Sequence, residues 1–276
     1  MHFEIQAHRG ARAFFPENTV QAFCKAADLG VRVIELDLLV SGDHQLVVSH
    51  DPCLGAPHAA APDGRPLGEK DQGRFCLYDM SYAEIAAFGC GLPDPHFPLQ
   101  RGIDTAKPLI ADVFRQVDAH MLAHHLPGEM IFNLELKSWP DRDNELHPPP
   151  DVYAFLVAGQ IHRTSMASRV RVQSFDDRLL REVRMRYPEL CFGFLVDDGS
   201  RLANFRAETG FVPAYVNPYY SLLNTQLVER LHSEGVRVVP WTVNRPEEML
   251  RLKRMGADGI ITDHPELALQ LEELFA

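Results

Sequence analysis

Short apolar stretches with the composition of β-strands alternate with amphipathic helical stretches along most of this chain. The sequence predicts eight such strands, at residues 5–8, 31–40, 130–136, 170–175, 190–196, 214–217, 236–243 and 259–262. Helical patterns, several with capping residues, fall at residues 16–30, 109–125, 150–161, 177–187, 224–234, 246–255 and 265–274. This alternation predicts an α/β fold of the (β/α)8 TIM-barrel type, in which crossover helices join parallel strands.

One segment interrupts the alternation. After the turn Ser41-Gly42-Asp43, residues 45–50 return as a hairpin strand, and residues 51–107 are rich in Pro and Gly, with a helical pattern only at 81–88. We interpret 51–107 as an insertion over the active-site face of a single catalytic domain that spans residues 1–276. This length suits one barrel, which typically takes about 250 residues. A doubly wound open sheet is the alternative, but no Gly-x-Gly-x-x-Gly turn follows the first strand.

Composition and charge narrow the classes of partner. The formal net charge of −11 argues against a nucleic acid or an anionic membrane surface. No apolar run approaches the ~18 residues of a membrane span, and no signal segment precedes the first strand, so we expect a cytoplasmic protein without stable membrane insertion. The five cysteines are scattered and odd in number, which predicts neither a disulfide framework nor a zinc site.

The pair Glu35-x-Asp37 is the strongest chemical signal in the chain. Residues two apart on a strand point to the same face, so the two carboxylates lie side by side. Two carboxylates that face one space repel each other unless a positive group lies between them, and a hard divalent cation fits that role. Read alone, such a pair is more often a solvated strand face than a metal site.

Polar residues also follow the other predicted strands. His8 and Arg9 end the first strand, and Glu135 and Lys137 share a face at the end of the strand 130–136. In a TIM barrel the carboxyl ends of the strands form the active site, so these side chains are expected at one mouth. Later strand ends add Gln173, Trp241, Asn244 and Asp263. Gln173 and Asn244 either line the pocket or satisfy buried backbone groups, Trp241 either packs in the core or walls the pocket, and Asp263 is expected to orient a neighbour.

Eight motifs follow one another in order: His8-Arg9-Gly10-Ala11, Pro16-Glu17-Asn18-Thr19, Glu35-x-Asp37, His50-Asp51, Leu134-Glu135-Leu136-Lys137, Gln173-Ser174-Phe175, Trp241-Thr242-Val243-Asn244, and residues 256–265, Gly-Ala-Asp-Gly-Ile-Ile-Thr-Asp-His-Pro. Together they resemble the glycerophosphodiester phosphodiesterase family over nearly the whole chain. The resemblance implies a TIM barrel, a divalent metal (Mg²⁺ or Ca²⁺), and hydrolysis of a small-molecule glycerophosphodiester to glycerol 3-phosphate and an alcohol. The segment after His50-Asp51 departs from the family pattern, so the specificity for the alcohol is the expectation with the least support.

The resemblance also implies roles for individual residues. By position, the metal ligands are Glu35, Asp37 and Glu135, the acid/base pair is His8 and His50, and the substrate contacts are Arg9, Lys137, Gln173 and Trp241. The chemistry is consistent, because a phosphodiester needs its charge neutralised and one proton removed while another is delivered. We favour His8 as the acid and His50 as the base, and the sequence leaves open whether water or the substrate's 2-hydroxyl attacks.

Two other functions fit the same residues. A phospholipase D-like enzyme acting on lysophospholipids would need a long apolar groove in the insertion, and a catalytically inactive phosphodiester-binding barrel would keep the site without turnover. The intact histidines and carboxylates argue against the second alternative. The sequence does not indicate an oligomeric state.

Overall fold

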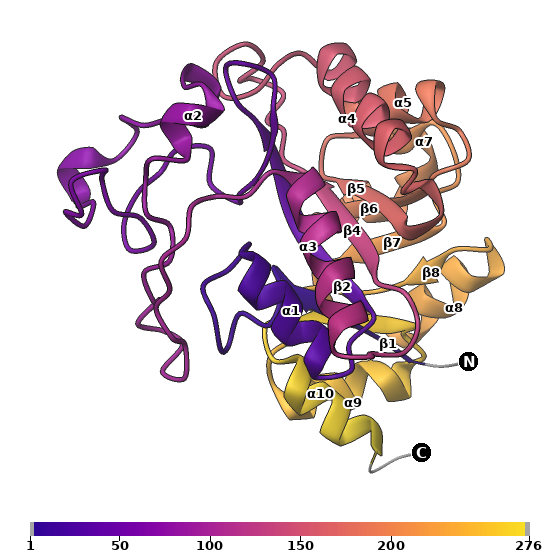
Figure 1. The fold of residues 1–276 in the computed structure, drawn as a ribbon. Coiled ribbons are helices and arrows are strands. Elements are labelled where there is room, and N and C mark those ends of the chain that lie inside the picture. Colours follow the sequence, from indigo (N-terminus) through magenta and orange to yellow (C-terminus); the bar gives the residue numbers. More distant parts are fainter. Residues whose placement is uncertain (1–2, 274–276) are drawn as a thin grey trace.

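A computed structural model describes residues 3–273, in which one nine-stranded sheet curls into a barrel (Figure 1). The strand order is β8-β7-β6-β5-β4-β2-β1-β9, neighbours in this order are parallel, and β3 pairs antiparallel with β2. The TIM-barrel prediction is therefore confirmed. The strands are β1 (Glu4–His8), β2 (Val33–Val40), β3 (Leu46–Val48), β4 (Ile131–Leu136), β5 (Val170–Ser174), β6 (Cys191–Val196), β7 (Tyr215–Pro218), β8 (Arg237–Val238) and β9 (Gly259–Thr262).

Helices follow most strands and cover the outside of the barrel. They are α1 (Val20–Asp28), α2 (Tyr82–Ile85), α3 (Ile110–Ala123), α4 (Pro150–Thr164), α5 (Asp177–Arg186), α6 (Gly199–Ala203), α7 (Phe205–Thr209), α8 (Thr225–Ser233), α9 (Pro246–Met255) and α10 (Pro265–Glu273). The predicted end of the last helix at 274 lies outside the described residues. None of the helices within 3–273 has both the length and the hydropathy that crossing a membrane requires.

The barrel closes through isolated hydrogen bonds from β9 and the residue before it to β8 and the segment after it. The predicted strand 236–243 is regular only at Arg237–Val238, because Pro240 has no N–H to donate to a ladder. The amide of Asp258 donates to the carbonyl of Val238 at 2.9 Å, and that of Ile261 donates to the carbonyl of Pro240 at 2.9 Å. The barrel is therefore closed where the ladder is interrupted.

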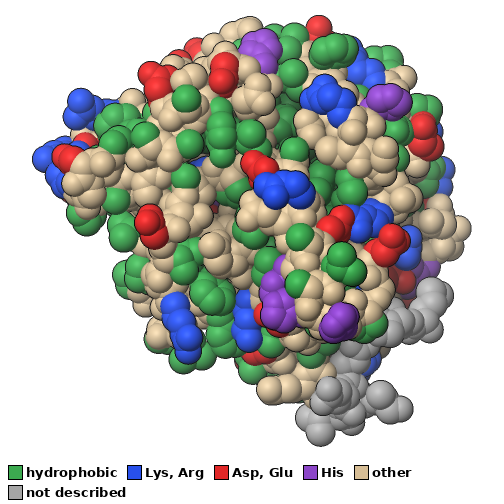
Figure 2. Space-filling model, viewed as in Figure 1, with side chains coloured by type: hydrophobic (Ala, Val, Ile, Leu, Met, Phe, Trp, Pro, Cys, Tyr) green, Lys and Arg blue, Asp and Glu red, His purple; other side chains and the backbone are tan. Residues whose placement is uncertain are grey.

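Burial explains why the strands read as apolar runs. All eight residues of β2 are buried, since one face meets the helices and the other meets the barrel interior. The main apolar core lies between strands and helices and includes Phe23, Phe132 and Phe194. On the face shown in Figure 2, acidic and basic side chains are interspersed, so no single-sign patch dominates it.

The segment 51–107 forms a lobe beside the barrel and carries α2 (purple in Figure 1). Its helix is shorter than the predicted 81–88, and Leu77 and Ile85 pack on Leu39 and Val47 of the β2–β3 hairpin. The lobe also has a small apolar cluster of its own, which includes Leu54, Leu67 and Phe88.

The structure contradicts the prediction for the cysteines. Cys53 and Cys76 form a disulfide within the lobe, although Cys24, Cys90 and Cys191 are free as expected. The two residues are 23 apart in sequence and meet in an isolated antiparallel bridge. Pairing of this kind depends on how the lobe folds, which cysteine number and spacing do not reveal.

Candidate active site

A cavity of about 190 Å³ opens at the carboxyl ends of the barrel strands. Eight of the nine predicted site residues line it or its rim: His8, Arg9, Glu35, His50, Glu135, Lys137, Gln173 and Trp241. The ninth, Asp37, is buried beside them. The structure thus brings together residues from β1, β2, β4, β5 and the loops that follow β3 and β8.

Strand register places three carboxylates around one point. Asp37 of β2 pairs laterally with Glu135 of β4, and Glu35 lies two residues before Asp37 on the same face. One oxygen from each of Glu35, Asp37 and Glu135 lies within 4.8 Å of the others, and all three side chains are buried. Burial, together with the charges of Asp37 and Glu135, raises the pKa of Glu35 well above its usual range.

This donor set fits a hard divalent cation. Asp37 Oδ1 is buried and accepts no hydrogen bond among the residues described, so one ligand atom lacks a partner. Carboxylate oxygens are the ligands that Mg²⁺ and Ca²⁺ prefer. Burial alone would raise the pKa of Asp37, but Arg9 and Lys137 lower it below its ordinary value, so this carboxyl is ionised and able to bind a cation.

Polar neighbours hold the three carboxylates in place, and some of them are shared. Glu35 accepts hydrogen bonds from the backbone N–H of Arg9 at 3.1 Å and from Nε2 of Gln173 at 3.3 Å. Glu135 accepts from Lys137 Nζ at 2.6 Å, and the same Nζ lies 3.8 Å from Asp37. Gln173 therefore donates to a candidate metal ligand and also lines the cavity.

Arg9 lies in the turn between β1 and α1 with φ +54°, a conformation that non-glycine residues adopt only under local constraint. The next residue, Gly10, has φ +86°, and a Cβ there would come within 2.8 Å of Ala22. This close turn aims the backbone N–H of Arg9 at Glu35. The guanidinium of Arg9 donates to both carboxylate oxygens of Glu17 at 2.9 Å, and its Nε lies 3.2 Å from Asp37.

Glu17 and Asn18 were not among the predicted site residues. The segment Pro16-Glu17-Asn18-Thr19 has the pattern of a capped helix start, and Thr19 does cap α1. Asn18, however, donates from Nδ2 to Asp37 Oδ2 at 2.8 Å and accepts from the Asp37 backbone N–H at 3.2 Å. Both residues are buried, a property that would have marked them had it been visible in the sequence.

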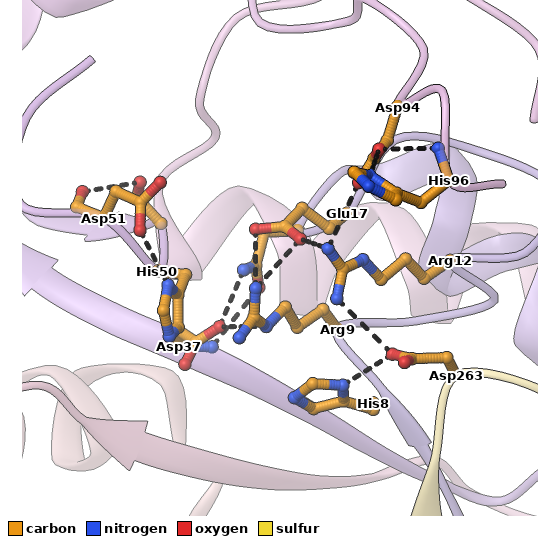
Figure 3. Close-up of polar contacts among 12 residues, drawn as sticks. His8, Arg9, Arg12, Glu17, Asp37, His50, Asp51, Asp94, His96 and Asp263 are labelled. Atoms are coloured by element: carbon orange, nitrogen blue, oxygen red, sulfur yellow. Dashed lines mark hydrogen bonds and ion pairs between the residues drawn. The ribbon is translucent and has the colours of Figure 1, made fainter. Parts of the chain in front are cut away.

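His8 is held by Asp263, in the orienting role that the sequence suggested (Figure 3). His8 Nδ1 lies 2.6 Å from Asp263 Oδ1, and Asn244 donates from Nδ2 to Asp263 Oδ2 at 2.6 Å. Burial raises the pKa of Asp263, but His8 and Arg12 lower it, and the net pKa is well below the usual range. Because Nδ1 is engaged, Nε2 is the His8 nitrogen left for a substrate in the cavity.

His50 is the second histidine that lines the cavity, and it lies apart from His8, beside Asp51, in Figure 3. Its Nδ1 lies 2.8 Å from Asp51 Oδ1, and its side chain is 32% exposed, against 13% for His8. The hydrogen bond to His50 lowers the pKa of Asp51 to about 2, so the carboxyl is ionised at neutral pH. Both histidines therefore have one nitrogen fixed by a carboxylate and the other free, an arrangement suited to proton transfer.

Aromatic side chains wall the cavity. Trp241 donates from Nε1 to the carbonyl of Asn217 at 2.8 Å, and its ring packs edge-on against Phe175 at 5.4 Å between centroids. Trp241 is therefore a wall of the cavity and not core filler. A larger cavity of about 650 Å³ adjoins the first and shares His50, Glu135, Lys137 and Phe175 with it.

Comparison with known proteins identifies the family to which this fold and site correspond. Residues 8–267 match the model of the glycerophosphoryl diester phosphodiesterase family. A glycerophosphodiester phosphodiesterase of Caldanaerobacter subterraneus subsp. tengcongensis is 29% identical over 272 residues, which cover 97% of this chain and 96% of that protein.

Two solved structures share the fold. A Silicibacter pomeroyi protein assigned to the same family superposes with a TM-score of 0.86 at 28% identity, covering 99% of this chain and 94% of its own. An Oleispira antarctica phosphodiesterase, solved in complex with its product sn-glycerol-3-phosphate, superposes with a TM-score of 0.77 at 20% identity and covers 98% and 96%. The second likeness concerns the fold alone.

Proposed function

Because the chain belongs to the glycerophosphoryl diester phosphodiesterase family, we propose that it hydrolyses glycerophosphodiesters to glycerol 3-phosphate and an alcohol with a divalent cation, Mg²⁺ or Ca²⁺, and two histidines. As a member of this family it is an enzyme that hydrolyses phosphoric diesters, as the sequence predicted. The observation that carries the finer proposal is the placement of Glu35, Asp37 and Glu135 within 4.8 Å of one another beside His8 and His50.

The residues of the cavity divide the work of hydrolysis. A cation held by Glu35, Asp37 and Glu135 would neutralise phosphate charge and polarise the phosphorus–oxygen bonds. Arg9 and Lys137 line the cavity and remain the proposed phosphate contacts. His8 would donate a proton from Nε2 to the leaving alcohol oxygen, while His50 would accept one at Nε2 from the nucleophile.

The two adjoining cavities suggest how a substrate lies. The smaller one has the apolar walls Phe175, Leu195 and Trp241, which suit the carbons of glycerol beside the phosphate. The larger one opens beside His50 and Lys137 and would receive the alcohol. We propose that residues 1–276 act as one catalytic domain, with 51–107 as an insertion at the active-site face.

Hydrolysis of intact lysophospholipids has less support. An apolar acyl chain needs a groove continuous with the catalytic cavity. The insertion does contain a groove of about 500 Å³ lined by Ala, Gly and Pro with Leu92 and Ile103, but it shares no lining residue with either catalytic-side cavity. The cavity that does adjoin the site is lined by several carboxylates, including Asp177 and Asp197, which an acyl chain would desolvate unfavourably.

The cytoplasmic location remains a prediction. The disulfide between Cys53 and Cys76 counts against it, because disulfides persist mainly in oxidising compartments. A small-molecule substrate agrees with the size of the catalytic cavity.

The metal requirement is tested with a panel of glycerophosphodiesters assayed with Mg²⁺, Ca²⁺ or Mn²⁺ after treatment with a chelator. We expect no turnover without added metal, and Glu35→Gln should weaken binding of the metal, measured directly by calorimetry. Full activity of chelated protein would show the metal role to be wrong. The exposed Glu69→Gln is the matched control, since Glu69 lies in the insertion away from both cavities.

The order of the histidines is tested with leaving groups of different basicity. The p-nitrophenolate of a p-nitrophenyl ester of glycerol phosphate leaves without protonation. On this ester, His8→Ala should therefore recover most of the activity that it loses on glycerophosphocholine. The activity of His50→Ala should stay low on the same ester, because a proton must still be removed from the nucleophile. The reverse pattern would exchange the two roles.

A further inference from the structure

Lys107 is the last residue of the insertion and is an unusual buried cation. The residue is only 7% exposed, and among residues 3–273 no hydrogen bond or ion pair engages its Nζ, an atom that is nevertheless not fully buried. The only other lysine buried to this extent in that range, Lys137, is paired with Glu135 and Asp37. A lysine ammonium that has no carboxylate partner is available to an anionic ligand that reaches it.

Backbone register places Lys107 on the face of the sheet that carries the site, although Lys107 lines neither of the two cavities there. Val47 bridges Leu109 in antiparallel fashion, and the amide of Val48 donates to the carbonyl of Pro108 at 2.9 Å. Continuing this register sets Lys107 opposite Ser49, whose amide donates to the carbonyl of Asp37. Since paired residues share a face, Lys107 lies on the Asp37 face of the sheet, two strand spacings or about 10 Å away.

Charge effects agree with this position. Arg9 and Arg12 are the main groups that lower the pKa of buried Glu17 against the effect of burial, and Lys107 adds to them. The pKa of Asp51 is lowered chiefly by its hydrogen bond to His50, and Lys107 again contributes. Lys107 therefore lies near both Glu17, which pairs with Arg9, and Asp51, which pairs with His50.

The other cations of the site are already neutralised. Arg9 pairs with Glu17 and Asp37, and Lys137 pairs with Glu135 and Asp37. Even with a divalent cation bound, the four carboxylates of Glu17, Glu35, Asp37 and Glu135 balance its charge and those of Arg9 and Lys137. This set leaves no net positive charge for a phosphodiester anion.

We propose that Lys107 binds the phosphate group of the substrate and of the product glycerol 3-phosphate, and so supplies the missing positive charge from the insertion. The proposal rests on the proposed function for the identity of the substrate. It gives the insertion a direct part in binding the phosphate, which both substrate and product carry, rather than the alcohol, which varies between substrates.

The test compares Lys107→Met with Lys107→Arg and with the exposed insertion control Lys70→Met, each loaded with saturating Mg²⁺. Calorimetry measures binding of glycerol 3-phosphate. We expect Lys107→Met to weaken it by roughly 10- to 100-fold, the effect of losing one charged contact. Lys107→Arg and Lys70→Met should bind nearly as the wild type does, and added KCl should weaken binding by the wild type more than by Lys107→Met.

Kinetics and stability provide the remaining readouts. KM for two diesters with different alcohols should rise by the same factor in Lys107→Met, with kcat within about a factor of three of wild type. The melting temperature should change little, because Nζ makes no hydrogen bond or ion pair within the described residues; a lysine that only supports the fold would lower it.

Unchanged binding of glycerol 3-phosphate in a folded Lys107→Met variant would overturn the proposal. So would an increase in KM for one alcohol alone, since that would place Lys107 at the alcohol. If the wild type binds glycerol 3-phosphate but turns over no glycerophosphodiester, the proposed function fails while the role of Lys107 in binding phosphate is still measured.

Discussion

Replacing Asp263 with Asn should remove proton donation by His8 without changing the shape of the site. Asn244 fixes the outcome, because its Oδ1 accepts from the backbone N–H of Asp263 at 3.0 Å and from Thr262 Oγ1 at 3.3 Å. Its Nδ2 must then face position 263 as a donor, at 2.6 Å. A new Asn at 263 would turn its oxygen toward Asn244 and its NH₂ toward His8.

That orientation forces the wrong tautomer on His8. Nδ1 of His8 now lies 2.6 Å from an acceptor and can carry a proton. Facing an NH₂ donor, it must become an acceptor, so the doubly protonated ring that donates from Nε2 is excluded. We expect kcat on glycerophosphocholine to fall by about 10³- to 10⁴-fold with little change in KM.

Asp263→Ala sharpens the prediction. It removes the carboxylate but places no donor against Nδ1, so His8 keeps both tautomers and loses only its orientation. We expect a smaller fall in kcat, about 10²-fold. The larger substitution should thus be the milder one catalytically, the reverse of the order expected if Asp263 mattered only for packing.

The assay is steady-state kinetics on glycerophosphocholine and on a p-nitrophenyl ester, with unfolding in urea as the check on folding. Asp258→Asn is the matched control, because Asp258 pairs with His232 at 2.9 Å immediately before the opposite end of β9. It should leave kcat unchanged. Equal losses for Asp263→Asn and Asp263→Ala, or a loss on the p-nitrophenyl ester as large as that on glycerophosphocholine, would refute the reasoning.

Three further predictions concern stability. Burial raises the pKa of Asp263, but its cationic neighbours lower it by more, so the net pKa in the folded protein is below the usual value. The stability that this carboxylate adds is therefore present above about pH 4 and is lost as the pH falls below that value. Between about pH 5 and pH 2, urea denaturation should show a larger loss of unfolding free energy for the wild type than for Asp263→Asn. Reduction of the disulfide between Cys53 and Cys76, 23 residues apart, should lower the unfolding free energy by about 3 kcal/mol, and a variant with Ser at both positions should be insensitive to dithiothreitol. Gly10→Ala, at φ +86° and with its Cβ 2.8 Å from Ala22, should lose about 1–3 kcal/mol in the same assay and bind Mg²⁺ more weakly; unchanged metal binding would show that the turn does not position Glu35.

The fold could be predicted because parallel strands buried on both faces read as apolar runs, as in β2. The elements that the sequence did not predict correctly are short or irregular. The two five-residue helices α6 and α7 are too short to show a helical period, so residues 199–209 carried no signal. The predicted strand 236–243 was shortened by Pro240, whose effect on pairing depends on which neighbour it faces.

The candidate metal ligands could be predicted for a related reason. Alternation along β2 places Glu35 and Asp37 on one face, and parallel pairing brings Glu135 level with Asp37. These relations follow from the period of a strand and the order of the strands. Cys53 and Cys76 follow no such rule, since their meeting depends on the path of an irregular segment.

Asn18 and Glu17, which hold Asp37 and Arg9, escaped prediction because both lie in a loop that the local pattern explained in another way. Asn18 has φ +57° and directly precedes the cap of α1, so its sequence context is accounted for without reference to Asp37, 19 residues later. Glu17 likewise reads as a polar first-turn residue, yet it is buried against Arg9. A carboxylate ligand can be identified from the alternation along its own strand. Its hydrogen-bond partner comes from a turn that lies over it only in the folded barrel, so the local sequence does not identify that partner. Substitutions at Asn18 or Glu17 should therefore change metal and phosphate binding more than helix stability, although the sequence motif alone suggests the opposite.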